Sequence, residues 1–204
     1  MVQPHTLDVG LRLRWSNMLT TKDYARAAKA LGCSQEAIKA VTQVESRGDG
    51  FLPSGEPVIL FERHIMNRRL RAKGIIVRDQ LDVVNTAPGG YKGGAAEHQR
   101  LAKAVLIDRD AALESCSWGM FQIMGFHWKS LGYKSLQAFI NDAYKSEAAH
   151  LNMFVKFIIA NPRIHKALKE LNWDAFARGY NGPMYKRNRY DTKLAAAYIK
   201  ALSE

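Results

Sequence analysis

Glu45 is the first residue whose type and position could do chemistry. It falls on the same helical face as Ile38 and Val41, so its carboxylate interrupts an apolar stripe that should pack inward. A glycine-containing turn at residues 48–50 should end the helix directly after it. Partial burial and the negative end of the helix dipole both disfavour a charged carboxylate, so we expect a raised pKa that suits a general acid. The alternative is a helix-terminal glutamate paired with a surface base such as Arg47.

Gln122 is the second candidate, because it is the one amide within an otherwise apolar segment. The rest of residues 118–125 are aromatic, aliphatic, methionine or glycine, and such segments usually pack in a core. A buried amide must either be paired within the protein or meet a polar ligand. The sequence leaves both outcomes open.

Metal catalysis and thiol catalysis find little support. The histidines show neither a His-Glu-x-x-His pair nor a short ligand spacing, so we expect no metal or other cofactor. Cys116 lies in a Glu-Ser-Cys-Ser-Trp segment that superficially resembles a cysteine-peptidase site, but a small buried thiol is the better interpretation. Cys33 and Cys116 are the only cysteines, and we expect free thiols, with a single bridge as the alternative.

The periodicity of the sequence predicts the elements that position these residues. Thr20 and Asp23 form a capping-box pattern at the start of one helix, and Ser34 caps the next helix, which carries Glu45. Residues 57–61 are rich in β-branched and aromatic residues and predict a strand. Further helices are expected over residues 95–113, 142–160, 162–171 and 173–180, and over a last helix capped by Asp191 and reaching Leu202. The fold should be mainly α, with a small β element.

The composition indicates one globular domain. Of the 204 residues, 47% are hydrophobic and 24% are charged, which suits a chain that buries one core. Residues 7–15 alternate between apolar and polar, so we expect residues 1–18 to form an N-terminal arm ahead of a domain over residues 19–204. No apolar run approaches the roughly 18 residues of a membrane span, and the N-terminus has no secretory pattern. We therefore expect synthesis in the cytoplasm, with access to an external target opened by another protein.

The net charge of +11 predicts attraction to a polyanion, which could be nucleic acid, an acidic membrane face or a cell-wall polymer. A helix-turn-helix motif for nucleic acid is one interpretation of the two helices joined at residues 31–34. The second of these helices begins with one acid, one base and an apolar face, whereas a recognition helix begins with polar or basic side chains. The pattern favours a core helix.

Three separated segments together resemble the lysozyme superfamily, which includes goose-type lysozymes and lytic transglycosylases. They are Val44-Glu45-Ser46-x-Gly48, Ser117-Trp118-Gly119-Met120-Phe121-Gln122-Ile123-Met124 and Tyr180-Asn181-Gly182-Pro183. More narrowly, these segments resemble the N-acetylmuramidase family of bacteriophage endolysins when taken with Ile59-Leu60-Phe61-Glu62-Arg63-His64 and Phe176-Ala177-Arg178-Gly179. The resemblance covers residues 19–201.

The resemblance implies a lysozyme-like fold and a muramidase that cuts the β-1,4 bond between N-acetylmuramic acid and N-acetylglucosamine. It makes Glu45 the general acid that protonates the departing glycosidic oxygen. Ser117 and Gln122 match the motif that hydrogen-bonds sugar N-acetyl groups or the acid itself. Tyr180 and Asn181 would line the opposite wall, the first with a stacking face and the second with a polar amide. A lytic transglycosylase on the same fold and a helix-turn-helix protein are the alternatives.

Glu62 is the candidate for a second carboxylate. It follows the predicted strand at residues 57–61, whose end could aim it across a groove toward Glu45. Asp49 is the next candidate, and an ion pair of Glu62 with His64 or a nearby arginine is the structural alternative. Carboxyl groups about 5 Å apart favour retention, a separation of about 6.5 to 9.5 Å favours inversion, and a lone acid favours a transglycosylase.

Peptidoglycan is the partner that the resemblance implies, and an anionic cell-envelope surface is the second partner expected for the positive charge. Nucleic acid is not an expected partner, and we expect a monomer. Many relatives add a small peptidoglycan-binding module, for which the 204 residues leave no room. Attachment to the wall is therefore expected to depend on the catalytic groove and the positive surface.

Overall fold

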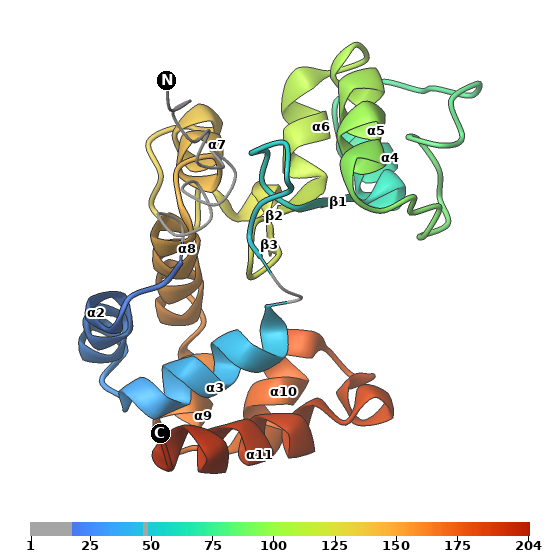
Figure 1. Cartoon of the computed structure of the whole chain (residues 1–204). Helices are drawn as coiled ribbons and strands as arrows, with labels where there is room; N and C mark the ends of the chain where they lie inside the picture. The colour runs from blue at the N-terminus through green and yellow to red at the C-terminus, as the bar shows by residue number, and fades with distance from the viewer. Residues whose placement is uncertain (1–17, 47–48) are drawn as a thin grey trace, which may run out of the picture.

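The computed structural model describes residues 18–46 and 49–204 (Figure 1). The N-terminal arm expected over residues 1–18 lies, apart from Met18, outside these residues, as do Arg47 and Gly48. The elements are α2 (Thr21–Leu31), α3 (Gln35–Glu45), β1 (Ile59–Phe61), α4 (Arg63–Ala72), α5 (Ala95–Val105), α6 (Arg109–Glu114), β2 (Cys116–Trp118), β3 (Ile123–Met124), η1 (Gly125–His127), α7 (Leu136–Ala143), α8 (Glu147–Ile159), α9 (Pro162–Lys169), α10 (Trp173–Asn181), η2 (Tyr185–Asn188) and α11 (Tyr190–Leu202). Within the part of the chain described, none of the helices combines the length and the apolarity that a membrane span requires.

Capping side chains set the starts of α2 and α3, as predicted. The hydroxyl of Thr20 accepts a hydrogen bond from the backbone N–H of Asp23, whose carboxylate accepts one from the backbone of Thr20. Ser34 caps α3 in the same way, through the N–H three residues on. α3 then ends at Glu45, and the next residue, Ser46, has extended backbone angles. The glycine-containing turn expected directly after this helix includes Gly48, which lies outside the described residues.

α3 is a core helix, and α11 packs along it (Figure 1). Ile38 and Val41 have no exposed surface, and Gln43 is the one exposed residue of α3. A recognition helix must present side chains to the major groove of DNA. Because the apolar face of α3 is buried in the core, the helix-turn-helix interpretation is wrong.

A three-stranded antiparallel sheet in the order β1-β2-β3 forms the small β element (Figure 1). Leu60 pairs with Ser117, and Ser117 pairs with Met124, so one short strand joins two distant segments. The strand predicted at residues 57–61 is confirmed as β1 over its last three residues. All of β2 is buried, so it shows no period-two alternation by which the sequence could reveal it.

Two of the helices predicted from the sequence are shorter in the structure. The helix expected over residues 95–113 is two helices, because the chain turns after α5 and Asp108 caps α6 with its side chain. The helix expected over residues 142–160 starts only at α8, where Ser146 is the cap. Asp142 belongs to α7. The apolar residues continue at helical spacing through both turns, so the periodicity predicted unbroken helices. Asp108 and Ser146 are residue types that cap helices and mark where the turns end.

The start of α11 also differs from the prediction. Asp191 is not its cap but lies in the first turn, behind Arg189, which has a left-handed φ of 55°. A carboxylate inside the first turn still interacts favourably with the positive end of the helix dipole. The predicted helices at residues 162–171 and 173–180 are confirmed as α9 and α10, with small shifts at their ends.

Candidate active site

One cavity of about 380 Å³ is lined by every candidate residue, namely Glu45, Glu62, Ser117, Gln122, Tyr180 and Asn181. The ends of α3 and α10 contribute the first acid and the amide, and the end of β1 contributes the second acid. β2 and the turn after it contribute the serine and the glutamine. The cavity thus brings together Glu45 and Asn181, which lie 136 residues apart in the sequence.

The carboxylate of Glu45 is held by the amide of Asn181. Nδ2 of Asn181 donates a hydrogen bond of 2.9 Å to Oε2 of Glu45. Glu45 is half-buried, and its Oε1 has almost no contact with solvent. Oδ1 of Asn181 is buried as well and accepts no hydrogen bond from the described residues. A buried acceptor of this kind can be satisfied by a donor on a ligand.

Ser117 and Gln122 are paired with each other at the edge of the cavity. The hydroxyl of Ser117 donates to Oε1 of Gln122 at 2.7 Å, and Nε2 of Gln122 donates to the carbonyls of Gly119 at 2.9 Å and Val58 at 3.3 Å. Gln122 itself has a left-handed φ of 52°, a conformation that costs a non-glycine residue on the order of 1 kcal/mol. Of the two outcomes left open by the sequence, the amide takes pairing within the protein, which fixes the turn between β2 and β3.

Tyr180 is held by aromatic packing rather than presented as an open stacking face. Its ring stacks on Phe176 with centroids 5.5 Å apart and meets the edges of Phe154 and Phe157. Its hydroxyl donates to the carbonyl of Phe121 at 3.0 Å, which ties α10 to the segment before β3. Burial raises the pKa of Tyr180 well above its usual value, and the negative charge of Glu45 raises it further. The phenol is therefore a permanent donor beside the acid.

Glu62 is held by a residue that the sequence did not indicate. The hydroxyl of Tyr91 donates to both carboxylate oxygens of Glu62, at 2.9 Å each, and Nδ1 of His64 lies 3.2 Å from Oε2. Arg63 forms no pair with Glu62, because its guanidinium donates to backbone carbonyls of the following loop. Asp49, the other candidate for the second carboxylate, is exposed and is not part of the cavity lining.

Comparison with known proteins assigns the family. The N-acetylmuramidase family profile matches residues 34–202, a range that contains the whole candidate site. The chain belongs to the N-acetylmuramidase family. The muramidase is also similar to the crystal structure of the Burkholderia AP3 phage endolysin, with 48% sequence identity and a TM-score of 0.89 over 92% of this chain and 72% of that chain. No curated protein sequence matches.

Membership in this family identifies the reaction. The muramidase is a lysozyme-type glycoside hydrolase that acts on peptidoglycan, and it is related to phage endolysins. The mainly α, lysozyme-like fold predicted from the sequence is confirmed. The roles of the individual site residues do not follow from membership and are proposals below.

His127 is a cavity residue that the sequence did not place. It lines the same cavity as the candidate residues, with its ring edge toward Phe157 at 5.3 Å between centroids. Burial lowers the pKa of His127, and the nearby charge of Arg69 lowers it further. The ring is therefore a neutral polar group among apolar neighbours. No motif surrounds this histidine, so only the fold reveals its position.

The thiols of the muramidase are free and take no part in the site. Cys33 and Cys116 form no disulfide, as expected. Cys116 has no exposed surface, and burial raises its pKa well above the ordinary thiol value. A nucleophilic cysteine needs a thiolate, so the cysteine-peptidase interpretation is wrong.

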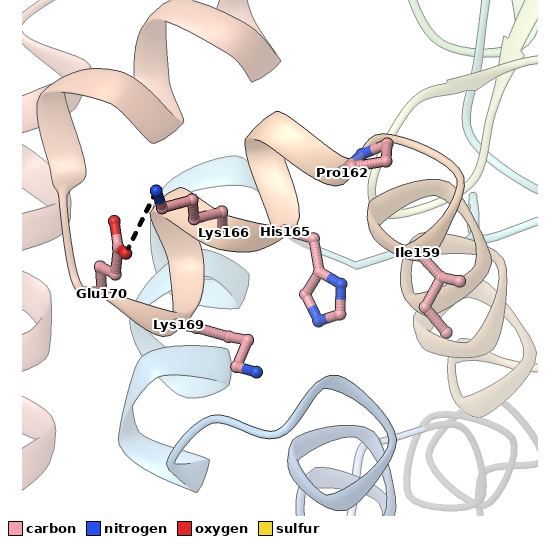
Figure 2. A pocket seen from close by; sticks show the side chains of 6 residues that line it. All are labelled: Ile159, Pro162, His165, Lys166, Lys169 and Glu170. Carbon is pink, nitrogen blue, oxygen red and sulfur yellow. Dashed lines mark ion pairs between the residues drawn. The ribbon is translucent and has the colours of Figure 1, made fainter.

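A second cavity, of about 330 Å³, lies against α9 and has a different chemistry (Figure 2). Its polar side chains are His165, Lys166, Lys169 and Glu170. The carboxylate of Glu170 is exposed and lies 3.8 Å from the ammonium of Lys166, and His165 contacts the carbonyl of Leu31 at 2.7 Å. Its one carboxylate is exposed, and its two lysines give the lining a net positive charge.

Proposed function

We propose that Glu45 is the general acid of the muramidase and protonates the glycosidic oxygen of the β-1,4 bond between N-acetylmuramic acid and N-acetylglucosamine. The observation that supports this role is the half-buried position of Glu45 in the cavity, with Oε2 bound by Asn181. An amide N–H donates to the carbonyl-type oxygen of a protonated carboxyl group rather than to its O–H. The bond from Asn181 therefore assigns the proton of the acid form to Oε1.

We infer that Glu62 is the second carboxylate. It reaches the same cavity from the end of β1, while Glu45 reaches it from the end of α3. Tyr91 donates to both of its oxygens, so Glu62 faces the cavity as an acceptor. As the glycosidic bond breaks, positive charge develops on the sugar ring. An ionised Glu62 stabilises that charge, either directly or by activating the attacking water.

The remaining polar groups of the cavity are proposed to bind the sugars. Oδ1 of Asn181 is the buried acceptor that an N-acetyl N–H or a sugar hydroxyl would satisfy. The hydroxyl of Ser117 already donates to Gln122, so it offers a substrate its acceptor lone pairs. Tyr180 is proposed to support the wall through its ring contacts rather than to stack on a sugar.

Two conservative substitutions test the acids. Glu45→Gln keeps the shape of the side chain and removes its proton, so we expect hydrolysis of purified peptidoglycan to fall by at least about a thousandfold while the thermal midpoint stays close to that of the wild type. Glu62→Gln should also lower the rate, without loss of binding to the wall. Wild-type rates in the Glu45→Gln variant would rule out the proposed acid.

The products of the digest test the mode of cleavage. Mass spectrometry of the fragments should show reducing N-acetylmuramic acid ends, because a second carboxylate in the cavity can activate water. Fragments ending in 1,6-anhydromuramic acid would instead mean that the sugar closes on itself, as in a lytic transglycosylase. Such products would remove the need for Glu62 and overturn its proposed role.

We also infer that the muramidase serves as a lysis enzyme that approaches the envelope through its positive charge. Its similarity to a phage endolysin supports the first point, and the net charge of +11 supports the second. Lys166 and Lys169, which are exposed and extend from α9 beside the second cavity, are two of the bases that would contribute to this attraction (Figure 2). The wall substrate would be reached after another protein has opened the membrane.

A further inference from the structure

We propose that Tyr91 is a positioning residue of the muramidase, which holds the carboxylate of Glu62 from behind the cavity in the orientation used for catalysis. The inference rests on the proposed function, in which Glu62 is the second carboxylate. Oη of Tyr91 lies 2.9 Å from each oxygen of Glu62. Tyr91 does not itself line the cavity. It therefore acts on the reaction through Glu62 and not through the substrate.

The phenol of Tyr91 is suited to be a constant donor. Burial raises the pKa of Tyr91 to about 12, and the hydrogen bond to Glu62 and the negative charge of that carboxylate contribute in the same direction. The hydroxyl thus keeps its proton at neutral pH. Because it is shared between both oxygens, the contact restrains rotation of the carboxylate about its last bond.

The loop that carries Tyr91 is fixed on one side by Arg63. This guanidinium donates to the carbonyls of Ala87 and Pro88 at 3.0 Å each, and to that of Leu81 at 3.4 Å. Gly90 packs closely on the same guanidinium group: a Cβ added at this position would lie 2.9 Å from one of its nitrogens. The φ of Gly90 is +78°, a left-handed conformation that favours glycine. Arg63 immediately follows Glu62 in the chain. The base next to the carboxylate thus holds the loop that returns to it.

The same loop is fixed on its other side by the buried carboxylate of Glu97. Oε1 of Glu97 accepts from the backbone N–H groups of Lys92 at 2.6 Å and Gly93 at 3.0 Å, and Oε2 accepts from that of Phe61 at 3.0 Å. Arg100 donates to Glu97 at 2.8 Å and to the carbonyl of Phe61 at 3.0 Å. One buried ion pair therefore fixes the residue before Glu62 and the residues after Tyr91.

Few other groups face Glu62. Nδ1 of His64, a residue of α4, lies 3.2 Å from Oε2 of Glu62 but makes no hydrogen bond. Glu45 lines the cavity from α3, the Glu97 and Arg100 pair contacts the backbone of Phe61 in β1, and Cys116 pairs with Phe61 from β2. Removal of the phenol hydroxyl would leave the ionised carboxylate without its hydrogen-bond donor from this loop. The interaction that favours the ionised carboxylate over its protonated form would be lost with that donor.

Tyr91→Phe tests the inference, because it removes the hydroxyl and keeps the ring. We expect kcat/KM on purified peptidoglycan to fall about tenfold, which is the effect of losing one hydrogen bond to a charged group. The acid limb of the pH profile should move to higher pH by roughly one unit. Gly90→Ala, which displaces the loop against Arg63, should shift the limb in the same direction. The thermal midpoint of each variant shows that it is folded.

Tyr144→Phe is the matched control. Tyr144 is 45% exposed, as against 46% for Tyr91, and it is not part of the cavity lining. The rate and pH profile of this variant should equal those of the wild type. A limb that moves equally in both variants would mean that the shift is not specific to the contact with Glu62, and would overturn the inference.

The double variant Glu62→Gln and Tyr91→Phe separates failure of the inference from failure of the proposed function. If Tyr91 acts through Glu62, the second substitution should add less than about a twofold loss to the first. A full tenfold additional loss would overturn the inference alone. If Glu62→Gln by itself left the rate unchanged, the proposed role of Glu62 would fail, and the inference with it. A folded Tyr91→Phe variant with a wild-type profile, beside an impaired Glu62→Gln variant, would refute only the positioning role.

Discussion

At the scale of single residues, the contact between Asn181 and Glu45 is where a small change should alter the chemistry most directly. Asn181→Asp removes the donor to Oε2 and places a like charge beside the acid. Both changes favour the protonated form of Glu45, so the acid should keep its proton to higher pH. We expect the basic limb of the rate profile to move up by about one unit or more.

A control on the same helix distinguishes this local effect from added charge in general. Asn172 caps α10 through its side-chain oxygen, and Asn172→Asp retains that cap while adding the same charge. Its pH profile should match that of the wild type. A basic limb that stays in place in Asn181→Asp, or moves to lower pH, would contradict the assignment of Glu45 as the acid.

The sequence predicted which residues meet in the site better than it predicted what each one contacts. Glu45 and Gln122 could be chosen from their types and local patterns, Asn181 was implied by the family resemblance, and all three line the cavity. Tyr91 could not be chosen, because its contact with Glu62 spans 29 residues and a glycine-rich loop has no periodicity to read. Side-chain partners across such a distance depend on tertiary packing, which local pattern does not encode.

At the scale of elements, His150 of α8 holds two loops next to the site. Its Nδ1 accepts from the N–H of Met120 at 3.2 Å and its Nε2 donates to the carbonyl of Ala143 at 2.7 Å, which fixes one neutral tautomer. Burial lowers the pKa of His150, in keeping with that neutral form. Gly50 and Gly119 lie against the ring, where an added Cβ would come within 2.5 Å and 2.6 Å of it.

Gly119→Ala should therefore destabilise the muramidase more than its backbone angle alone implies. The φ of +69° costs an alanine about 1 kcal/mol, and the clash with His150 should add about 1 to 3 kcal/mol. Gly132→Ala is the matched control, because Gly132 has a φ of +75° and no neighbour within 4 Å of an added Cβ. Urea unfolding compares the two. If both variants lost the same free energy of unfolding, the close packing of Gly119 on His150 would contribute nothing to stability.

The elements themselves were predictable where a cap or a period marks them. The cap residues Thr20 and Ser34 and the strand before Glu62 are all confirmed. The long helix expected over residues 95–113 failed because the apolar spacing continues through a turn that only Asp108 marks. Burial of every residue in β2 likewise left no alternation to detect. Periodicity reports which side of an element is buried and is silent where the whole element is buried.

At the scale of the whole molecule, the net charge of +11 should make wall binding dependent on salt. Attraction between exposed charges weakens as the Debye length shortens, so binding to purified sacculi should decline between about 0.05 and 0.5 M sodium chloride. A pull-down with the Glu45→Gln variant measures binding without digestion. Binding that is indifferent to salt would mean that the groove alone attaches the enzyme.

Charge reversal at the second cavity tests whether its lysines contribute to the salt-dependent binding to the wall. Lys166→Glu with Lys169→Glu lowers the net charge by four units on the face of α9 (Figure 2). We expect weaker binding at low salt and a flatter dependence on salt. The pair Lys166→Arg and Lys169→Arg keeps the charge and should bind as the wild type does.

The class of the fold was accessible from the sequence, but the arrangement of its parts was not. The spacing of the three motifs resembled one superfamily, and the similarity to a solved endolysin confirms the fold that this implies. That α11 packs along α3 depends on contacts between segments about 150 residues apart. Local helix propensity does not predict which distant helices pack against each other.

The packing of α11 along α3 has a consequence for the order in which the enzyme becomes active (Figure 1). α3, which ends at Glu45, is the second of the described helices along the chain, and α11, which packs along it, is the last of them. Asn181 lies 136 residues after Glu45, so a growing chain can form this contact only once α10 has been synthesised. We therefore expect a chain that lacks α10 and α11 to hold Glu45 without its contact to Asn181 and without the cover that α11 gives to α3.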